Sequence, residues 1–320
     1  MKLNLSLVVL IGIAFAASLL AGRIWLPPSA LLSSQDSLAG LILYDIRLPR
    51  TLLALITGAV LGLSGAVLQG FTRNPLAEPA LLGVSSGAAL GAIIAIYFGL
   101  AALSPITGPL MGIAGALGAC ALTFALGRNG TVALVLAGAA VSSLTAAGIA
   151  LALNFAPSPY AAYEIMSWLL GSLADKSWTQ AFLVLPFVIA GGAALAMTGR
   201  ALDALSLGEA QAASLGVHIA RLSAMVVAGT ALSVGAITSV TGAIGFIGLV
   251  APHLVRPFVG YAPRRVLLPA SLAGALLLLC ADIAARLVHT NPELRLGVFT
   301  SLLGTPFFFW LVVRIRKVAP

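Results

Sequence analysis

Charged side chains are scarce in this sequence. Of its 320 residues, 60% are hydrophobic and only 8% are charged, whereas soluble domains carry about 25% charged residues. So few charges cannot cover a surface that faces water on every side. The composition excludes an ordinary soluble protein and predicts a chain that lies in a membrane.

Lysines, cysteines and phosphate-binding motifs are also rare or missing. The lysines are Lys2, Lys176 and Lys317, and none belongs to a G-x-x-x-x-G-K-[ST] loop, so the chain does not hydrolyse ATP by that route. Cys120 and Cys280 lie in apolar runs, without the spacing of a metal or redox site. We therefore predict no enzymatic activity, no metal and no cofactor.

Long apolar runs, in contrast, recur from end to end. A transmembrane helix needs about 20 mostly apolar residues to cross a hydrocarbon core of about 30 Å. Ten runs approach or meet this length: 3–22, 51–71, 81–100, 106–127, 131–154, 179–199, 221–240, 243–259, 266–288 and 297–313. They predict an all-α polytopic membrane protein in which residues 1–320 form one transmembrane domain. The run 243–259 is short and contains Pro252, so we expect it to be kinked or partly re-entrant.

Glycine is plentiful, with 34 residues. Lipid gives helices no hydrophobic reason to associate, so their packing relies on small residues that let the backbones approach. The glycine-rich stretches 58–70 and 191–199 therefore predict helix-packing faces.

Lysine and arginine set the expected orientation, because they accumulate in the cytoplasmic loops of membrane proteins. With the N-terminus inside, the inner side holds Lys2, Arg73, Arg128, Arg200, Arg221, Arg256, Arg264, Arg265, Arg314, Arg316 and Lys317. The outer side holds Arg23, Arg47, Arg50, Lys176, Arg286 and Arg295. Both termini are thus predicted to be cytoplasmic. Topology accounts for the net charge of +8 without a nucleic-acid partner.

Three of the outer arginines, Arg47, Arg50 and Arg286, stand at the ends of apolar runs, against this bias. Charge placement leaves two interpretations open. In the first, the long side chains extend to the lipid headgroups or pair with Asp45 and Asp282, without a partner protein. Alternatively, they form a docking surface for carboxylates of a soluble partner, which the planar guanidinium can bind through two parallel hydrogen bonds.

The inner loop 200–222 is too polar to span a membrane. Its part 205–217 predicts one or two short helical turns broken at Gly208 and Gly216, and such helices can fit a groove on a partner. The central parts of the apolar runs carry almost no charge, whereas ion-coupled transporters usually have ionisable residues there. We therefore expect the energy for transport to come from another subunit. An ion-coupled secondary transporter without an ATPase remains the alternative.

Five stretches carry a resemblance to a known family. They are RLPRTLLALITGAVLGLSGAVLQGFTRNPLAEPALLGVSSGAALG (47–91), LSLGEAQAASLGV (205–217), GAIGFIGLVAPHLVR (242–256), LLPASLAGALLLLCADIAARL (267–287) and LGVFTSLLGTPFFFWLV (296–312). In these stretches the chain resembles the permease subunits of binding-protein-dependent ABC importers for iron chelates, cobalamin and haem, of the FecCD type. The family's usual ELP before the last span is ELR here, with Arg295 in place of the proline.

This resemblance implies a ten-helix permease of the bacterial inner membrane, present as a homodimer or paired with a paralogue. Two ATP-binding-cassette subunits would bind its cytoplasmic face, and a periplasmic or lipid-anchored substrate-binding protein would dock outside. ATP-driven alternating access would move the cargo between the two permease copies. An iron–siderophore is the first expectation for the cargo, followed by cobalamin and haem.

The resemblance also implies roles for particular residues. Arginines at the positions of Arg47, Arg50 and Arg286 receive carboxylates of the binding protein. Residues 201–219 look like the coupling helices that meet the ATPase, with contacts expected from Leu207, Gly208, Glu209, Ala212 and Leu215. By family position, Thr131 and Val132 lie near the cytoplasmic gate.

Overall fold

The structure is a computed structural model that describes residues 2–32, 34–35, 37–127, 130–288, 290 and 293–316. Across these residues the regular secondary structure is helical throughout. Arg128 and Lys317, two of the inner cations in the topology prediction, lie outside the described residues.

The helices follow one another along the chain with short connections. In order they are α1 (Lys2–Leu20), η1 (Pro28–Leu32), α2 (Leu38–Leu41), η2 (Ile42–Arg47), α3 (Leu48–Thr72), η3 (Pro79–Leu82), α4 (Val84–Tyr97), η4 (Leu100–Ala102), α5 (Thr107–Leu126), α6 (Thr131–Asn154), α7 (Pro159–Leu169), α8 (Trp178–Met197), α9 (Gly199–Leu205), α10 (Glu209–Ser214), α11 (Ile219–Thr241), α12 (Ile247–Val259), α13 (Pro263–Leu287) and α14 (Leu296–Arg316).

Ten apolar segments of the described chain match the ten predicted runs. Seven are long enough to cross a bilayer: α1, the continuous segment Leu38–Thr72 that includes α3, and α5, α6, α8, α11 and α13. Three are shorter: α4, α12 and the Leu296–Phe309 part of α14. The predicted all-α polytopic membrane fold is therefore confirmed, whereas the placement of both termini in the cytoplasm stays a prediction.

The third segment, α4, is shorter than the predicted run 81–100. A 3₁₀ turn over Pro79–Leu82 precedes it, and Gly83 follows in the left-handed conformation with φ of 73°. Leu82 and Val84 on either side of this glycine are fully buried, so α4 begins inside the protein. Pro79 and Leu82 are buried in this turn, whereas Ala80 is exposed, so one side of the turn packs into the protein.

The eighth segment is irregular at its start, whereas Pro252, the residue on which the prediction of a kink rested, lies inside α12. Residues 242–246 are unwound between α11 and α12, with φ of 71° at Gly242 and 67° at Phe246. The missing side chain of Gly304 leaves room for the Phe246 ring, because a Cβ at Gly304 would overlap that ring. The carbonyl of Thr241 accepts a hydrogen bond from the Ser172 backbone N–H at 2.7 Å, which satisfies a group at the end of α11.

Glycine brings the central helices into close contact. In α3, any Cβ at Gly58 would lie 2.8 Å from the Cα of Ala275 in α13, and one at Gly62 would overlap the Ala270 carbonyl oxygen. In α8, a Cβ at Gly191 would lie 2.6 Å from the Gly229 carbonyl oxygen of α11. The two predicted packing faces are therefore confirmed, and each permits backbone-to-backbone approach.

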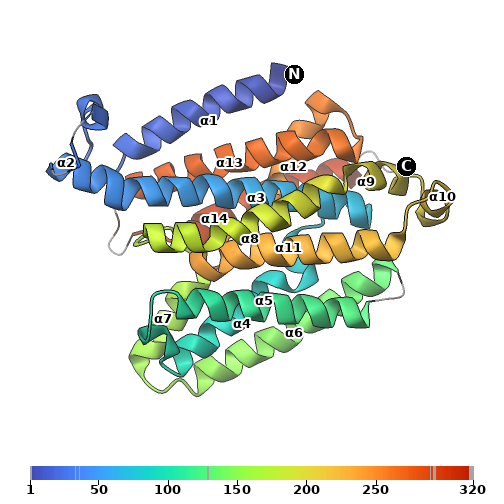
Figure 1. Ribbon diagram of the computed structural model, residues 1–320, viewed down its shortest axis with the longest axis horizontal. Coiled ribbons are helices and arrows are strands. Elements are labelled where there is room, and N and C mark those ends of the chain that lie inside the picture. The colour runs from blue at the N-terminus through green and yellow to red at the C-terminus, as the bar shows by residue number, and fades with distance from the viewer. Residues whose placement is uncertain are drawn as a thin grey trace.

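The helices divide into a central set and a peripheral set. In the segment Leu38–Thr72 and in α11, 72% and 78% of the apolar window is buried, against 22% in both α1 and α8. Figure 1 shows α3 and α13 running together on one side of the molecule and α4, α5 and α6 on the other, with α11 between the two groups. The peripheral helices leave apolar faces free for lipid or for another membrane subunit.

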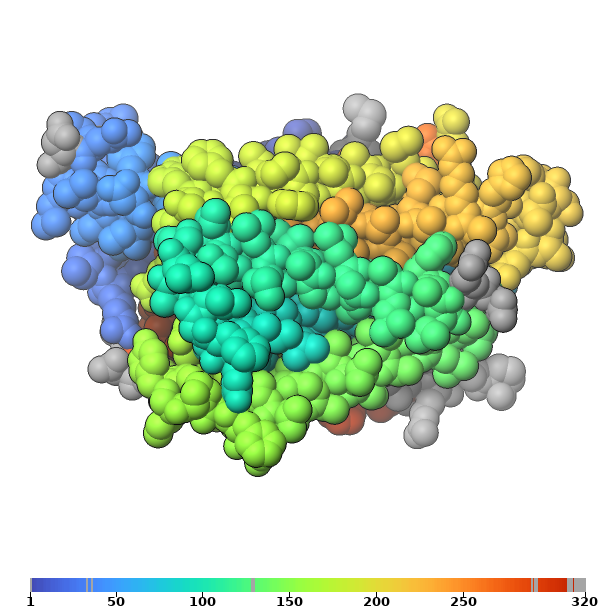
Figure 2. Space-filling view, turned by 60° about the horizontal axis from the view of Figure 1, so that its bottom comes forward, coloured from blue at the N-terminus to red at the C-terminus, as the bar shows by residue number. Residues whose placement is uncertain are grey.

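Two groups of short helices mark opposite ends of the elongated bundle. The segment around α2 projects at one end and the segment around α10 at the other (Figures 1 and 2). The last turns of α14 lie at the α10 end. The arginines Arg47, Arg50 and Arg286 thus belong to one end of the molecule, and the predicted coupling segment belongs to the other.

Candidate functional site

The structure brings Arg47, Arg50 and Arg286 together at the α2 end of the bundle. Arg47 is the last residue of η2, Arg50 lies in the first turn of α3, and Arg286 lies in the last turn of α13. Pro49 is the second residue of α3, just after the helical segment passes from the wider η2 turn into the α-helix. The side chains of two helices that run side by side therefore meet at this end.

Arg50 is bound by two carboxylates of its own chain. Its Nη2 donates to Asp282 Oδ1 at 2.8 Å and to Glu293 Oε1 at 2.5 Å, and its Nε donates to Asp282 Oδ1 at 3.0 Å. The Arg50 and Asp282 side chains are 11% and 0% exposed, whereas that of Glu293 is 29% exposed. Asp282 is thus a buried partner, and Glu293 is the partner at the surface.

Arg286 and Arg47 are held mainly by backbone carbonyls. Arg286 Nη2 pairs with Asp282 Oδ2 at 2.9 Å, and its Nη1 donates to the carbonyls of Ser18 and Ala21 at 2.9 and 3.0 Å. Arg47 donates to the carbonyls of residues 19, 20 and 24 at the end of α1. The relative exposures of Arg47 and Arg286 are 7% and 6%, so both residues tie α1 to the bundle.

These contacts test the first of the two interpretations of the outer arginines. The pairing with Asp282 is confirmed, while Asp45 forms no ion pair in the part of the chain that the structure describes. The three guanidiniums are buried and do not snorkel towards a membrane surface. Sequence reasoning missed Glu293, because only the fold brings it to Arg50. The docking role of Arg47, Arg50 and Arg286 stays a prediction.

The predicted coupling segment forms a compact projection at the other end. Leu207 and Leu215 are 63% and 66% exposed, while Ala212 is fully buried and anchors α10. Gly208, immediately before α10, has φ of 110°, a conformation that side chains rarely adopt. Both leucines lie on this projection and are accessible to another protein.

The residues predicted as gate and as coupling helix are in direct contact. Thr131, the first residue of α6, is 8% exposed, and its Oγ1 donates a hydrogen bond to Glu209 Oε1 at 2.6 Å. Glu209 is the first residue of α10. Val132, the next residue of α6, is instead 75% exposed. Of the two residues predicted at the gate, Thr131 therefore bonds the start of α6 to α10, and Val132 does not.

A further element at the α2 end was not predicted from the sequence. Helix α7 lies between two predicted spans and begins at a Ser158 cap that accepts a hydrogen bond from the Ala161 N–H. Two cavities of about 280 and 150 Å³ adjoin it, and Glu164, Trp168 and Lys176 line both. Burial lowers the pKa of Lys176, with neighbouring Asp175 acting in the opposite direction.

Comparison with known proteins identifies the family to which this chain belongs. The family model of the FecCD transport family matches residues 9–314, which is nearly the whole chain. The chain belongs to the FecCD transport family. It is thus a multi-pass membrane permease, and the family resemblance drawn from the sequence is confirmed.

Individual relatives of this FecCD permease match over almost their entire length. The chain is 41% identical to the "Vitamin B12 import system permease protein BtuC" of Salmonella paratyphi A over 98% of this chain and 95% of the relative. It is 39% identical to the protein of the same name from Klebsiella pneumoniae subsp. pneumoniae, over 97% of this chain and 93% of the relative. A solved metal-chelate type ABC transporter in an inward-facing conformation is 33% identical, with a TM-score of 0.86 and 98% of each chain covered.

Proposed function

We propose that this FecCD permease is the membrane subunit of an ABC importer that moves a metal chelate across the bacterial inner membrane. The observation that carries the proposal is the 41% identity to vitamin B12 import permeases over 98% of the chain. This identity changes the order of cargoes expected from the sequence: cobalamin comes first, and iron–siderophores and haem follow. The chain itself is no enzyme, since ATP hydrolysis belongs to a separate subunit.

The two ends of the molecule fit different soluble partners. In each permease copy, the projection with exposed Leu207 and Leu215 suits a groove on one of the two ATPase subunits. The arginine end suits a substrate-binding protein. A second permease copy, identical or paralogous, completes a path between the two chains. ATP-driven closure of the ATPase pair then moves the coupling segments and reorients the spans in alternating access.

Reconstitution tests this function directly. The permease is placed in liposomes with its ATPase subunits inside and its binding protein outside, and uptake of labelled cobalamin, ferric siderophore and haem is compared. We expect ATP-dependent uptake of cobalamin, and none when the ATPase subunits are omitted. Uphill uptake by the permease alone, driven by an ion gradient, would favour the secondary transporter instead.

Docking of the binding protein is proposed at Arg50, with Arg47 and Arg286 as supports. Arg47 and Arg286 already donate hydrogen bonds to backbone carbonyls, and Arg286 also pairs with the buried Asp282. The guanidinium of Arg50, in contrast, also pairs with the partly exposed Glu293. A carboxylate of the binding protein can take the place of Glu293 in the same two-point geometry. Glu293 therefore competes, from within the same chain, with the binding protein's carboxylate for Arg50.

The variant Glu293→Gln tests this docking proposal without disturbing the buried pair of Arg50 and Asp282. We expect the binding protein to bind this variant several-fold more tightly at low ionic strength, because Arg50 has lost its own competing anion. Asp45→Asn removes an exposed outer carboxylate that forms no ion pair among the described residues; it is the matched control and leaves binding unchanged. Unaltered binding to Glu293→Gln, together with unaltered binding to Arg50→Lys, would remove docking from this cluster.

A further inference from the structure

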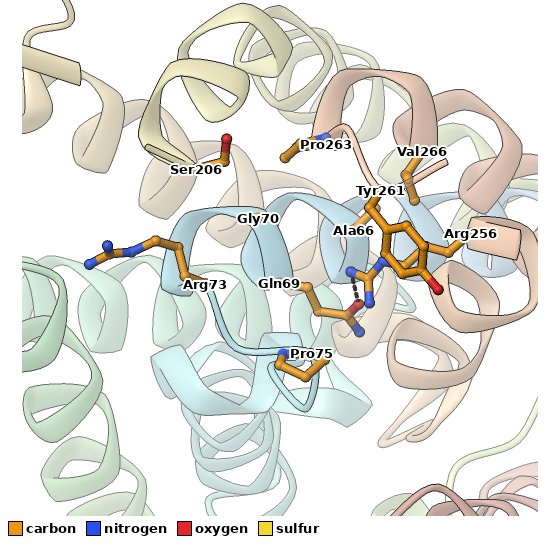
Figure 3. A pocket seen from close by; sticks show the side chains of 10 residues that line it. All are labelled: Ala66, Gln69, Gly70, Arg73, Pro75, Ser206, Arg256, Tyr261, Pro263 and Val266. Atoms are coloured by element: carbon orange, nitrogen blue, oxygen red, sulfur yellow. Dashed lines mark hydrogen bonds between the residues drawn. The ribbon is translucent and has the colours of Figure 1, made fainter. Parts of the chain in front are cut away.

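A polar pocket of about 270 Å³ opens near the C-terminal end of α3, beside the coupling segment. Figure 3 shows its walls, which come from α3, α12 and α13, with Ser206 above them. The residues that matter here are Gln69, Arg73, Ser206, Arg256 and Tyr261. None of the residues that line the pocket is acidic.

Arg256 reaches into this pocket and is held there by neutral groups. Its Nη2 donates to Gln69 Oε1 at 2.6 Å (Figure 3), and its Nη1 contacts His253 Nδ1 at 3.1 Å. The Gln69 amide is oriented in turn by the carbonyls of Gly248 and Leu249, each at 3.4 Å. A guanidinium only donates hydrogen bonds, so His253 Nδ1 must accept, and His253 is neutral in this contact.

The positive charge of Arg256 therefore has no anionic partner among the described residues. Two of its N–H groups are used by Gln69 and His253, and its other N–H groups remain as donors. Asp203 does not line the pocket; it accepts from the backbone N–H of Arg264 at 2.9 Å. A half-buried cation with spare donors and no counterion is a binding site for an anion.

The surroundings of the pocket indicate where such an anion comes from. Phe258 and Tyr261 are 74% and 80% exposed, and exposed aromatic rings at helix ends are typical of the membrane–water interface. Arg264 and Arg265 in the first turn of α13 are also exposed, and basic pockets between helices on the cytoplasmic side bind anionic lipid headgroups. In Figure 3, Arg73 points away from Arg256 and extends the basic surface on the opposite rim.

We propose that this pocket binds a phosphate group, supplied by an anionic phospholipid of the leaflet at the α10 end of the bundle. The phosphate oxygens accept from the spare N–H groups of Arg256, and the Tyr261 ring lies at the level of the headgroups. The pocket contains none of the three docking arginines and none of the five expected ATPase contacts, although Ser206 belongs to the predicted coupling segment 201–219. It does not depend on the identity of the cargo. Because Ser206 lies within the predicted coupling segment, bound lipid adjoins the part of the chain that, under the proposed function, faces the ATPase.

The test counts the lipids that remain on the full-length chain. The permease is reconstituted in nanodiscs of phosphatidylcholine with phosphatidylglycerol, transferred to detergent, and measured by native mass spectrometry. We expect the wild type to retain phosphatidylglycerol, Arg256→Gln to retain it about tenfold more weakly, and Arg256→Lys to lie between them. Tyr261→Ala, at an exposed position where misfolding is not expected, also weakens retention. The matched control Arg221→Gln removes an exposed inner arginine away from the pocket and retains lipid like the wild type.

Three results would overturn the proposal. The first is equal retention of phosphatidylglycerol by the wild type, Arg256→Gln and Tyr261→Ala. The second is binding of inorganic phosphate by the permease in pure phosphatidylcholine, with displacement of phosphatidylglycerol by excess phosphate, which would make the ligand a soluble anion. The third is loss of the lipid when the ATPase subunits are added, which would make the pocket part of that protein interface.

Discussion

Replacing Asp282 by asparagine is the most direct test of the buried network at the α2 end. The Asp282 side chain is fully buried and serves two arginines at once, Arg50 at 2.8 Å and Arg286 at 2.9 Å. Asparagine keeps the size and removes the charge. Arg50 then still has Glu293, whereas Arg286 has no carboxylate and is held only by carbonyl and hydroxyl groups around Ser18.

The structure sets the size of the expected effect. Removing one partner of a buried ion pair costs about 3–5 kcal/mol, because the other charge stays buried without compensation. We expect Asp282→Asn to lower the free energy of unfolding by about this amount, mainly through Arg286. Glu293→Gln is the control, since that carboxylate is partly exposed and its loss costs about 1 kcal/mol or less.

Unfolding of the purified permease by SDS, followed by circular dichroism, measures these differences. The double variant Asp282→Leu with Arg286→Met removes the two charges of one buried pair and should recover much of the lost stability, since a buried pair can often be replaced by apolar groups of similar size. If Asp282→Asn unfolds at the same SDS fraction as Glu293→Gln, the carboxylate at position 282 is not a structural element, and the reasoning is wrong.

Two further predictions concern helix packing and coupling. Gly62→Val should prevent close packing of α3 on α13, because its Cβ overlaps the Ala270 carbonyl oxygen; a loss of about 2 kcal/mol or more in SDS unfolding is expected, against little change for Gly12→Val, which has open space. Thr131→Val removes the hydrogen bond to Glu209 and should leave ATP hydrolysis by the assembled complex largely intact while cargo uptake per ATP falls several-fold. Uptake per ATP equal to the wild type would show that this bond carries no coupling.

The transmembrane segments were predictable because each leaves its own composition signal in the chain. Helix α7 was not, since its 11 residues are too short for a span and fall in what hydropathy alone shows as a loop. A local signal was nevertheless present: Ser158 followed by Pro159 is a typical helix start. The short α4 was overestimated because hydropathy does not distinguish the buried turn over Pro79–Leu82 from a helix.

The candidate sites were predicted as residues but not as contacts. Arg50 and Glu293 are separated by 243 positions, and Thr131 and Glu209 by 78, so only helix packing determines that they meet. The pairing of Asp282 with the arginines was one of the interpretations that charge placement had left open. That Arg256 has no counterion could not be foreseen, because it depends on where the fold places the acidic residues.

The unwound stretch between α11 and α12 has a mechanical consequence. A continuous helix must break backbone hydrogen bonds before one half can tilt against the other, and in hydrocarbon each unsatisfied group costs several kcal/mol. Residues 242–246 have already given up the helical pattern, and a glycine and a phenylalanine with positive φ mark the two ends of the stretch. The backbone dihedral angles of this stretch can therefore change without breaking a hydrogen bond inside α11 or α12, which a continuous helix would not permit.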